Sequence, residues 1–259
     1  MGKVSLTSAL RHEYVYLFKT CEIRLNRISE VDLIVSKVLA HADRYKALEP
    51  LVKVPWYVIA CIHVLEASMR FDCHLANGDP LTARTIQVPA GRPKTGKPPF
   101  TWEESAIDIL TFKGLNGWGD WSLSSILYIL EKYNGWGYRN LQPEVLSPYL
   151  WSCSFHYVSG KYVKDHQWSK TAVSKQIGCA VILRRLAEKG HIVLEPTILD
   201  LVVDYSPQKA TKEAMELQRE LNKLPGIFLL VDGKAGKKTS DAFRSISGKY
   251  LPGDPRQVA

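Results

Sequence analysis

The chain has 259 residues, which is long enough to bury a sizeable core and to hold one large domain with a small one. Its formal net charge of +8 favours an anionic partner. The basic residues are scattered, however, and the sequence has no helix-turn-helix, zinc-finger or RNA-binding signature, so we expect no nucleic-acid partner.

The cysteines and the N-terminus indicate the cell compartment. Five cysteines form an odd set without a CxxC pair, which signals neither a disulfide framework nor a zinc site. We expect buried thiols in a reducing compartment for Cys21, Cys61, Cys73, Cys153 and Cys179. Charged residues interrupt the only apolar stretch near the N-terminus, so we expect no secretory signal and no stable membrane association.

Residues 5–49 are predicted to be helical. Val31, Val35 and Val38 recur at helical spacing, which favours two helices packed around the rest of the domain.

The next helix places one carboxylate at the end of an apolar segment. From Trp56 to Leu65 the only strongly polar groups are the Tyr57 hydroxyl and the His63 imidazole, so this helix should be an interior one. Glu66 follows directly. Partial burial would raise the pKa of Glu66 and make it a candidate proton donor, with His63 on the same face. In the alternative, the helix simply surfaces here and Glu66 pairs with Arg70.

A polar, turn-rich segment follows Glu66. Asn77-Gly78-Asp79-Pro80 is a tight-turn signal. The loose alternation over residues 81–88 predicts short strands, and hence a hairpin. Asp79 is a candidate second carboxylate, or else a turn residue that accepts hydrogen bonds from backbone amides. Residues 89–99 should form a loop.

Three more helices are expected before residue 190. Thr101 and Glu104 have capping-box spacing, which indicates a helix start. The helix Leu123–Lys132 should stop at the loop Tyr133–Tyr138, and Thr171–Lys189 has apolar residues at helical spacing. Asn134 could offer hydrogen bonds to a ligand, with Tyr133 or Tyr138 stacking against a flat face of it. The alternative is a helix cap followed by core aromatics.

Several segments together resemble a family of muramidase-type lysozymes and endolysins of phages, prophages and bacteria. They are IHVLEASMRFDCHLANGDPLTARTIQVPAGRP, PPFTWEESAIDIL, DWSLSSILYILEKYNGWGY and YLWSCSFHYVSGKY, within about residues 50–185. The resemblance implies a lysozyme-like α+β fold, mainly α with a small β-hairpin or sheet. It also implies that Glu66 is the catalytic acid and that Asp79 is its partner. The implied substrate-binding residues are His74, Thr85, Tyr133, Asn134 and Tyr138.

The C-terminal part resembles a small peptidoglycan-binding module. Residues 191–209, which include Pro196, are predicted to be a linker. Residues 210–259 carry the module's pattern at Leu217, Gln218, Leu221, Asn222, Val231, Asp232, Gly233, Gly236, Thr239 and Ala242. The resemblance implies a three-helix domain.

These observations predict two domains with one polymer as their target. Residues 1–190 would be the catalytic domain of an endolysin that hydrolyses the β-1,4 bond between N-acetylmuramic acid and N-acetylglucosamine in bacterial peptidoglycan and thereby lyses the cell. Glu66 would protonate the leaving oxygen, while Asp79 would orient water or stabilise the positive charge. We expect no metal, no organic cofactor and a monomer.

The resemblance also implies that the enzyme stays in the host cytoplasm until a separate holin opens the membrane. Two alternatives remain open at this stage. One is a lytic transglycosylase acting on the same bond. The other is a non-catalytic wall-binding or phage structural protein.

Overall fold

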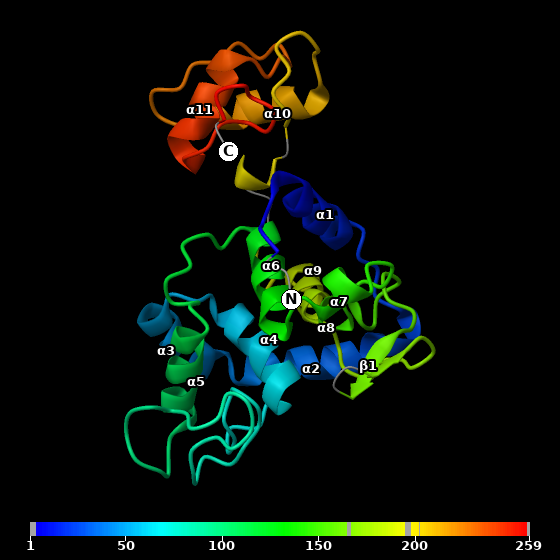
Figure 1. The fold of residues 1–259 in the computed structure, drawn as a ribbon, viewed down its shortest axis with the longest axis vertical. Helices are drawn as coiled ribbons and strands as arrows, with labels where there is room; N and C mark the ends of the chain where they lie inside the picture. Colours follow the sequence, from blue (N-terminus) through cyan, green and yellow to red (C-terminus); the bar gives the residue numbers. More distant parts are fainter. Residues whose placement is uncertain (1–3, 165–166, 195–197, 202, 258–259) are drawn as a thin grey trace. The chain divides into compact units, whose positions relative to one another are not determined.

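The structure is a computed structural model that describes residues 4–164, 167–194, 198–201 and 203–257. In these ranges the chain forms eleven α-helices, two short 3-10 helices and one two-stranded antiparallel sheet (Figure 1). The prediction of a mainly α-helical chain with a small sheet is therefore confirmed.

Contacts between residues divide the chain into two units. The first contains Leu17–Trp121 and Ser125–Val193, and the second contains Ser5–Tyr16, Ser122–Ser124 and Leu194–Ala259. Residues 5–16, which we predicted within the first domain, thus group with the second unit. Pro196 and its neighbours 195 and 197, together with residue 202 of the predicted linker, lie outside the described residues.

The helices that precede residue 190 are α1 (Ser8–Lys19), α2 (Ile28–Ala40), α3 (Ala42–Val52), α4 (Trp56–Ala67), α5 (Trp102–Phe112), α6 (Leu123–Asn134), α7 (Gly137–Leu141), α8 (Pro148–Trp151) and α9 (Cys179–Glu188), with a 3-10 turn at Leu25–Arg27. Residues 5–49 therefore hold α1, α2 and most of α3, not two helices. His41 lies outside helical geometry and separates α2 from α3.

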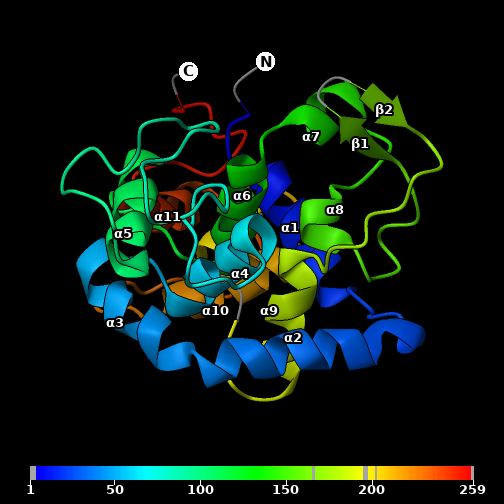
Figure 2. The same ribbon diagram turned by 90° about the horizontal axis from the view of Figure 1, so that it is seen from below.

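Helix α4 forms the centre of the first unit (Figure 2). Its residues from Val58 to His63 are all buried, and it packs against α3 and α9. An apolar surface on every side drives this placement, because each face has to be removed from water. The prediction of an interior helix is confirmed.

The sheet is not where we predicted it. It pairs β1 (Lys161–Lys164) with β2 (Gln167–Ser169), with Tyr162 opposite Trp168. The predicted strands over residues 81–88 are wrong, since these residues form turns and irregular loop. The Ile86 and Gln87 amides donate to the Asp79 carboxylate, and this side-chain contact replaces a strand ladder there.

Two other predictions about the first unit were tested by the structure. The capping box of α5 is confirmed, because Thr101 accepts from the Glu104 amide and the Glu104 side chain accepts from the Thr101 amide. The helix predicted at Thr171–Lys189 begins only at Cys179, after Gly178. Residues 171–178 are irregular.

The five cysteines are free and buried, as predicted. No single helix among the described residues is long and apolar enough to cross a membrane. The pair α3 and α4 meets that test only when joined, and its two helices are bent by 114°.

The second unit contains residues 8–16 of α1 together with α10 (Lys212–Leu221), α11 (Lys237–Ser247) and a 3-10 turn at Ile198–Asp200. Its core consists of Val203, Ala214, Leu217, Leu221, Ala235 and Leu251. Residues 210–257 thus hold two α-helices, not the three we predicted. After Gly248, Pro252 and Pro255 leave a turn-rich tail, because proline cannot continue a helix.

Candidate functional site

Glu66 lies on the last turn of α4, where the chain leaves the helix through Ser68 in a left-handed conformation. The Tyr149 hydroxyl of α8 donates a hydrogen bond to Glu66 Oε1 at 2.9 Å. The turn at Gly78 lies against the same helix end, since a Cβ atom added to Gly78 would be 3.6 Å from the Glu66 carbonyl oxygen. Glu66 is therefore surrounded by segments that are far apart in the sequence.

The pKa of Glu66 is raised above its ordinary value. Burial is the largest cause, because it disfavours the charged carboxylate. The Tyr149 hydrogen bond and the positive charge of Lys113 act in the opposite direction without cancelling it. A carboxyl group of this kind keeps its proton to higher pH than an exposed glutamate, which suits a general acid.

The alternative in which Glu66 pairs with Arg70 is wrong. Arg70 instead pairs with Asp72 at 3.3 Å. His63, which the sequence placed on the face of Glu66, is buried. Its Nδ1 lies 3.0 Å from the Tyr45 hydroxyl and its Nε2 lies 3.1 Å from the Arg70 carbonyl oxygen. Burial lowers the pKa of His63 to about 4, so the imidazole is neutral and holds the helix end in place.

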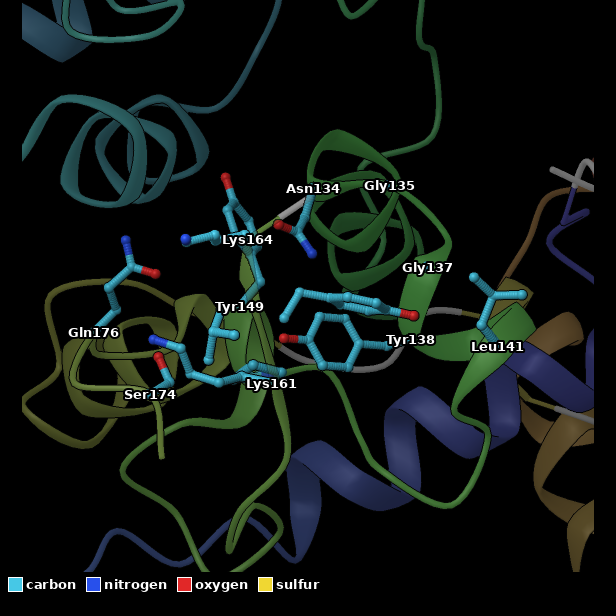
Figure 3. Close-up of a pocket in the computed structure, with 13 residues that line it drawn as sticks. Asn134, Gly135, Gly137, Tyr138, Leu141, Tyr149, Lys161, Lys164, Ser174 and Gln176 are labelled. Atoms are coloured by element: carbon cyan, nitrogen blue, oxygen red, sulfur yellow. The ribbon is translucent and has the colours of Figure 1, made fainter. Parts of the chain in front are cut away.

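A cavity of about 510 Å³ lies beside Tyr149 (Figure 3). Its lining comes from the ends of α6 and α8, from α7, from β1 and from the irregular segment before α9. The lining residues are Asn134, Gly135, Gly137, Tyr138, Leu141, Pro148, Tyr149, Lys161, Tyr162, Val163, Lys164, Ser174 and Gln176. The lining thus combines aromatic surfaces, amide and hydroxyl groups and two lysines, a mixture that suits a polar ligand with flat apolar faces.

Two buried phenol groups near this cavity have no hydrogen-bond partner within the described chain. They are the hydroxyls of Tyr133 and Tyr162. Tyr162 lines the cavity, and Tyr133 is close enough to Glu66 for the carboxylate charge to contribute to the raised pKa of its phenol, after the larger effect of burial. Buried polar groups without partners are rare, and they mark positions where a ligand or water can bond.

Asp79 occupies the tight turn but its carboxylate is engaged within the loop. Asp79 Oδ2 accepts from the Ile86 amide at 2.8 Å, from the Gln87 amide at 3.0 Å and from Asn77 Nδ2 at 3.0 Å. Burial raises the pKa of Asp79, but these hydrogen bonds outweigh it and the pKa is lowered. The contacts favour the alternative role of Asp79 as a turn residue, and its catalytic role stays a prediction.

His74 and Thr85 also support the loop. Both His74 ring nitrogens have partners at 2.8 Å, the Ser105 hydroxyl and the Ala83 carbonyl oxygen, and the imidazole is fully buried. Thr85 Oγ1 donates to the Pro89 carbonyl oxygen and accepts from the Arg92 amide. These contacts favour structural roles for both residues, and substrate binding by them stays an untested prediction.

Residues 133–138, which we predicted to be a loop, lie mostly in helices, since Tyr133 and Asn134 end α6 while Gly137 and Tyr138 begin α7. They contribute unequally to the cavity. Asn134 is exposed and lines the cavity, and Tyr138 lines it while packing edge-on against Tyr162 and Trp168. Tyr133 is not part of the cavity lining, and it lies under Lys113, whose Nζ is 4.9 Å from the ring centre. The structure therefore brings two of the three predicted residues to one cavity.

The sequence did not single out Tyr149, Lys161 or Gln176. Tyr149 and Lys161 lie in the segment YLWSCSFHYVSGKY, in which no single position was assigned a role. The only local signal is Ser147-Pro148, since proline favours the first turn of a helix and indicates α8. No sequence pattern marks Gln176 as a cavity residue. It precedes α9, in residues 171–178 that we had predicted to be helical.

In the second unit, the polar residues of the module pattern build the scaffold. Gln218 Nε2 donates to Asp232 Oδ1 at 2.9 Å and to Thr239 Oγ1 at 3.2 Å, and Gln218 Oε1 accepts from the Gly233 amide at 2.9 Å. Asn222 bonds both backbone groups of Leu229. These positions hold the loop between α10 and α11, so ligand contacts have to be sought on other residues.

No group of three or more His, Cys, Asp or Glu side chains in the described ranges is arranged to hold a metal ion. Comparisons of the chain with protein-family models, with curated proteins and with solved structures found no match.

Proposed function

We propose that the first unit is a lysozyme-like enzyme that hydrolyses the β-1,4 bond between N-acetylmuramic acid and N-acetylglucosamine in bacterial peptidoglycan. One observation carries the proposal: a glutamate whose pKa is raised by burial lies at the end of a buried helix, hydrogen-bonded to a tyrosine that lines a large polar cavity. The family resemblance supplies the substrate class.

In the proposed reaction, protonated Glu66 donates its proton to the glycosidic oxygen as the bond from this oxygen to the anomeric carbon breaks. The Tyr149 hydroxyl then stabilises the carboxylate that this leaves, and Lys113 contributes positive charge. A water molecule adds to the anomeric carbon and returns one proton to Glu66. The protonated acid is thereby restored for the next cycle.

The environment of Asp79 favours the lytic transglycosylase as a second candidate. One oxygen of Asp79 already accepts three hydrogen bonds within the loop. The described residues that line the cavity include no carboxylate. Glu66 would therefore act largely alone. In a transglycosylase the muramic acid's own 6-hydroxyl attacks the anomeric carbon and gives its proton to Glu66. No second carboxylate is needed to activate water.

The test compares wild type with Glu66→Gln, which keeps the side-chain shape but cannot donate the proton. A general acid contributes about 10²–10⁴-fold in rate, so Glu66→Gln should clear cell walls at least about a hundredfold more slowly. Glu22→Gln, at an exposed residue of the first unit that does not line the cavity, is the matched control and should clear them normally. Equal clearing by wild type and Glu66→Gln would refute the role of Glu66 and favour a non-catalytic wall-binding or structural protein.

Mass spectrometry of the released fragments separates the two enzymatic candidates. A hydrolase adds one water to each product, whereas a transglycosylase leaves an anhydro sugar. We propose that the second unit binds the same wall and tethers the catalytic unit, which raises its local concentration on an insoluble substrate.

A further inference from the structure

A second hollow in the first unit shares a residue with the cavity beside Tyr149. It has a volume of about 350 Å³ and is lined by Glu30, Leu33, Ile34, Lys37, Val64, Leu65, Ser68, Met69, Lys175, Gln176 and Ile177. Gln176 lines both hollows, and its Nε2 donates to the Leu65 carbonyl oxygen at 3.1 Å, one residue before Glu66. Gln176 thus lies between the two hollows and contacts the backbone one residue before the proposed acid.

The lining of this second hollow is apolar with positive charge at its edge. Aliphatic side chains of α2 and α4 form most of it, together with Met69 and Ile177. Its one acidic residue, Glu30, is neutralised by Arg27, whose Nη2 lies 2.7 Å from Glu30 Oε2. Lys37 and Lys175 have no such ion pair among the described residues and remain available to an anionic ligand.

The backbone at the hollow is unusual as well. Ser68 and Met69 are consecutive non-glycine residues with positive φ, 50° and 61°. They form the C-terminal cap of α4, in which the amides of Ser68 and Met69 donate to the His63 carbonyl oxygen. This cap ends α4 sharply and places both residues in the lining of the hollow.

We propose that this hollow binds the stem peptide of peptidoglycan while the attached muramic acid lies in the cavity beside Glu66. The proposal rests on the proposed function and extends it from the glycan to its peptide. Each stem peptide starts from a lactyl group on the sugar, so a strand bound at Glu66 carries its peptide to the adjacent hollow. Alanine methyl groups suit the aliphatic lining, and the peptide carboxylates suit Lys37 and Lys175.

The first experiment measures kcat/KM on purified glycan strands with their peptides and on strands from which an amidase has removed them. Wild type should prefer the peptide-bearing strands. The double variant Lys37→Glu/Lys175→Glu should lower this preference about fivefold, because two exposed charge contacts contribute about 1 kcal/mol together. Lys97→Glu/Lys170→Glu, with the same charge change on exposed residues of the first unit outside both linings, should keep the preference. Equal kcat/KM values for wild type on both strands would overturn the proposal.

The second experiment measures binding without cleavage, in the full-length Glu66→Gln protein. The chain has three methionines, and Met69 lies in the hollow while Met215 lies on α10. With ¹³C-labelled methionine methyl groups, free stem peptide should shift the Met69 signal and leave Met215 unchanged. Met69→Leu assigns the signal, and Lys37→Glu/Lys175→Glu should raise the peptide concentration needed for half of the shift about fivefold.

The two experiments distinguish failure of this inference from failure of the proposed function. If stem peptide leaves the Met69 signal unchanged, or if a peptide-free chitin oligomer shifts it equally, peptide binding is refuted whatever the enzyme cleaves. If stem peptide shifts Met69 selectively but neither strand is cleaved by wild type, the hollow is a peptide site and the proposed reaction is wrong.

Discussion

Replacing Tyr149 by phenylalanine changes the acid–base balance of Glu66 and leaves the helix that carries it intact. Burial raises the pKa of Glu66, and the hydrogen bond from the Tyr149 hydroxyl to Oε1 lowers it in part. A hydrogen bond to a charged group contributes about 1.5–3 kcal/mol. Even a loss of about 1.5 kcal/mol would disfavour the ionised carboxylate about tenfold. Tyr149→Phe should therefore raise the pKa of Glu66 further.

The direction of the effect on rate follows from the role of a general acid. Glu66 has to be protonated, so kcat/KM falls as the pH rises through its pKa. In Tyr149→Phe the alkaline limb of the pH–rate profile should therefore move to higher pH. The profile is measured from initial rates of cleavage of soluble glycan strands. Tyr133→Phe is the matched control, because its buried hydroxyl has no hydrogen-bond partner in the described structure. An alkaline limb that stays in place in Tyr149→Phe, or moves to lower pH, would refute the assignment of Glu66 as the acid.

Three further predictions concern stability. Asp79→Asn should destabilise the protein by about 1 kcal/mol at neutral pH, because two backbone amides lose a charged acceptor. Since the folded-state pKa of Asp79 is lowered, wild type should lose this advantage as the pH falls through that pKa, and the melting temperatures of the two proteins should converge in acid. Gly178→Ala should prevent the first unit from folding, as seen by circular dichroism, because its Cβ would lie 2.2 Å from the Leu150 carbonyl oxygen. Gly233→Ala, with φ of +76° and a Cβ 2.8 Å from the Thr211 carbonyl oxygen, should destabilise the second unit by about 2 kcal/mol or more. The Gly233→Ala protein should clear whole walls more slowly but still cleave soluble strands. If the second unit is unfolded in this variant and wall clearing is unchanged, the proposal that this unit tethers the enzyme to the wall is wrong.

The sequence was sufficient for features that depend on local pattern. The apolar run from Trp56 to Leu65 predicted a buried helix, and the Thr101–Glu104 spacing predicted a cap, since both signals lie within a few residues. The strands predicted over residues 81–88 failed because alternation alone does not show where backbone hydrogen bonds go. In the structure, the Asp79 carboxylate accepts those of Ile86 and Gln87 instead.

Only part of the candidate site could be predicted from the sequence. Glu66 could be found because burial follows from the residues before it in the chain. Tyr149 could not, because the hydrogen bond that joins it to Glu66 spans 83 residues. Gln176 was hidden for a related reason: the close approach of Gly178 to Leu150 starts α9 late and leaves the preceding residues irregular. Contacts of this length depend on the tertiary packing and leave no periodic trace in the sequence.

The position of Glu66 on the last turn of α4 has a consequence for how the site can change over evolution. The carboxyl group lies near the negative end of the helix dipole as well as in a desolvated position, and both effects disfavour its ionisation. Its acidity is therefore set largely by the position of the carboxyl group on the helix and by its burial, with Tyr149 as the cavity residue that opposes them. Substitutions that change how deeply the end of α4 is buried offer a route to shift the pKa of Glu66 without altering the lining of the cavity.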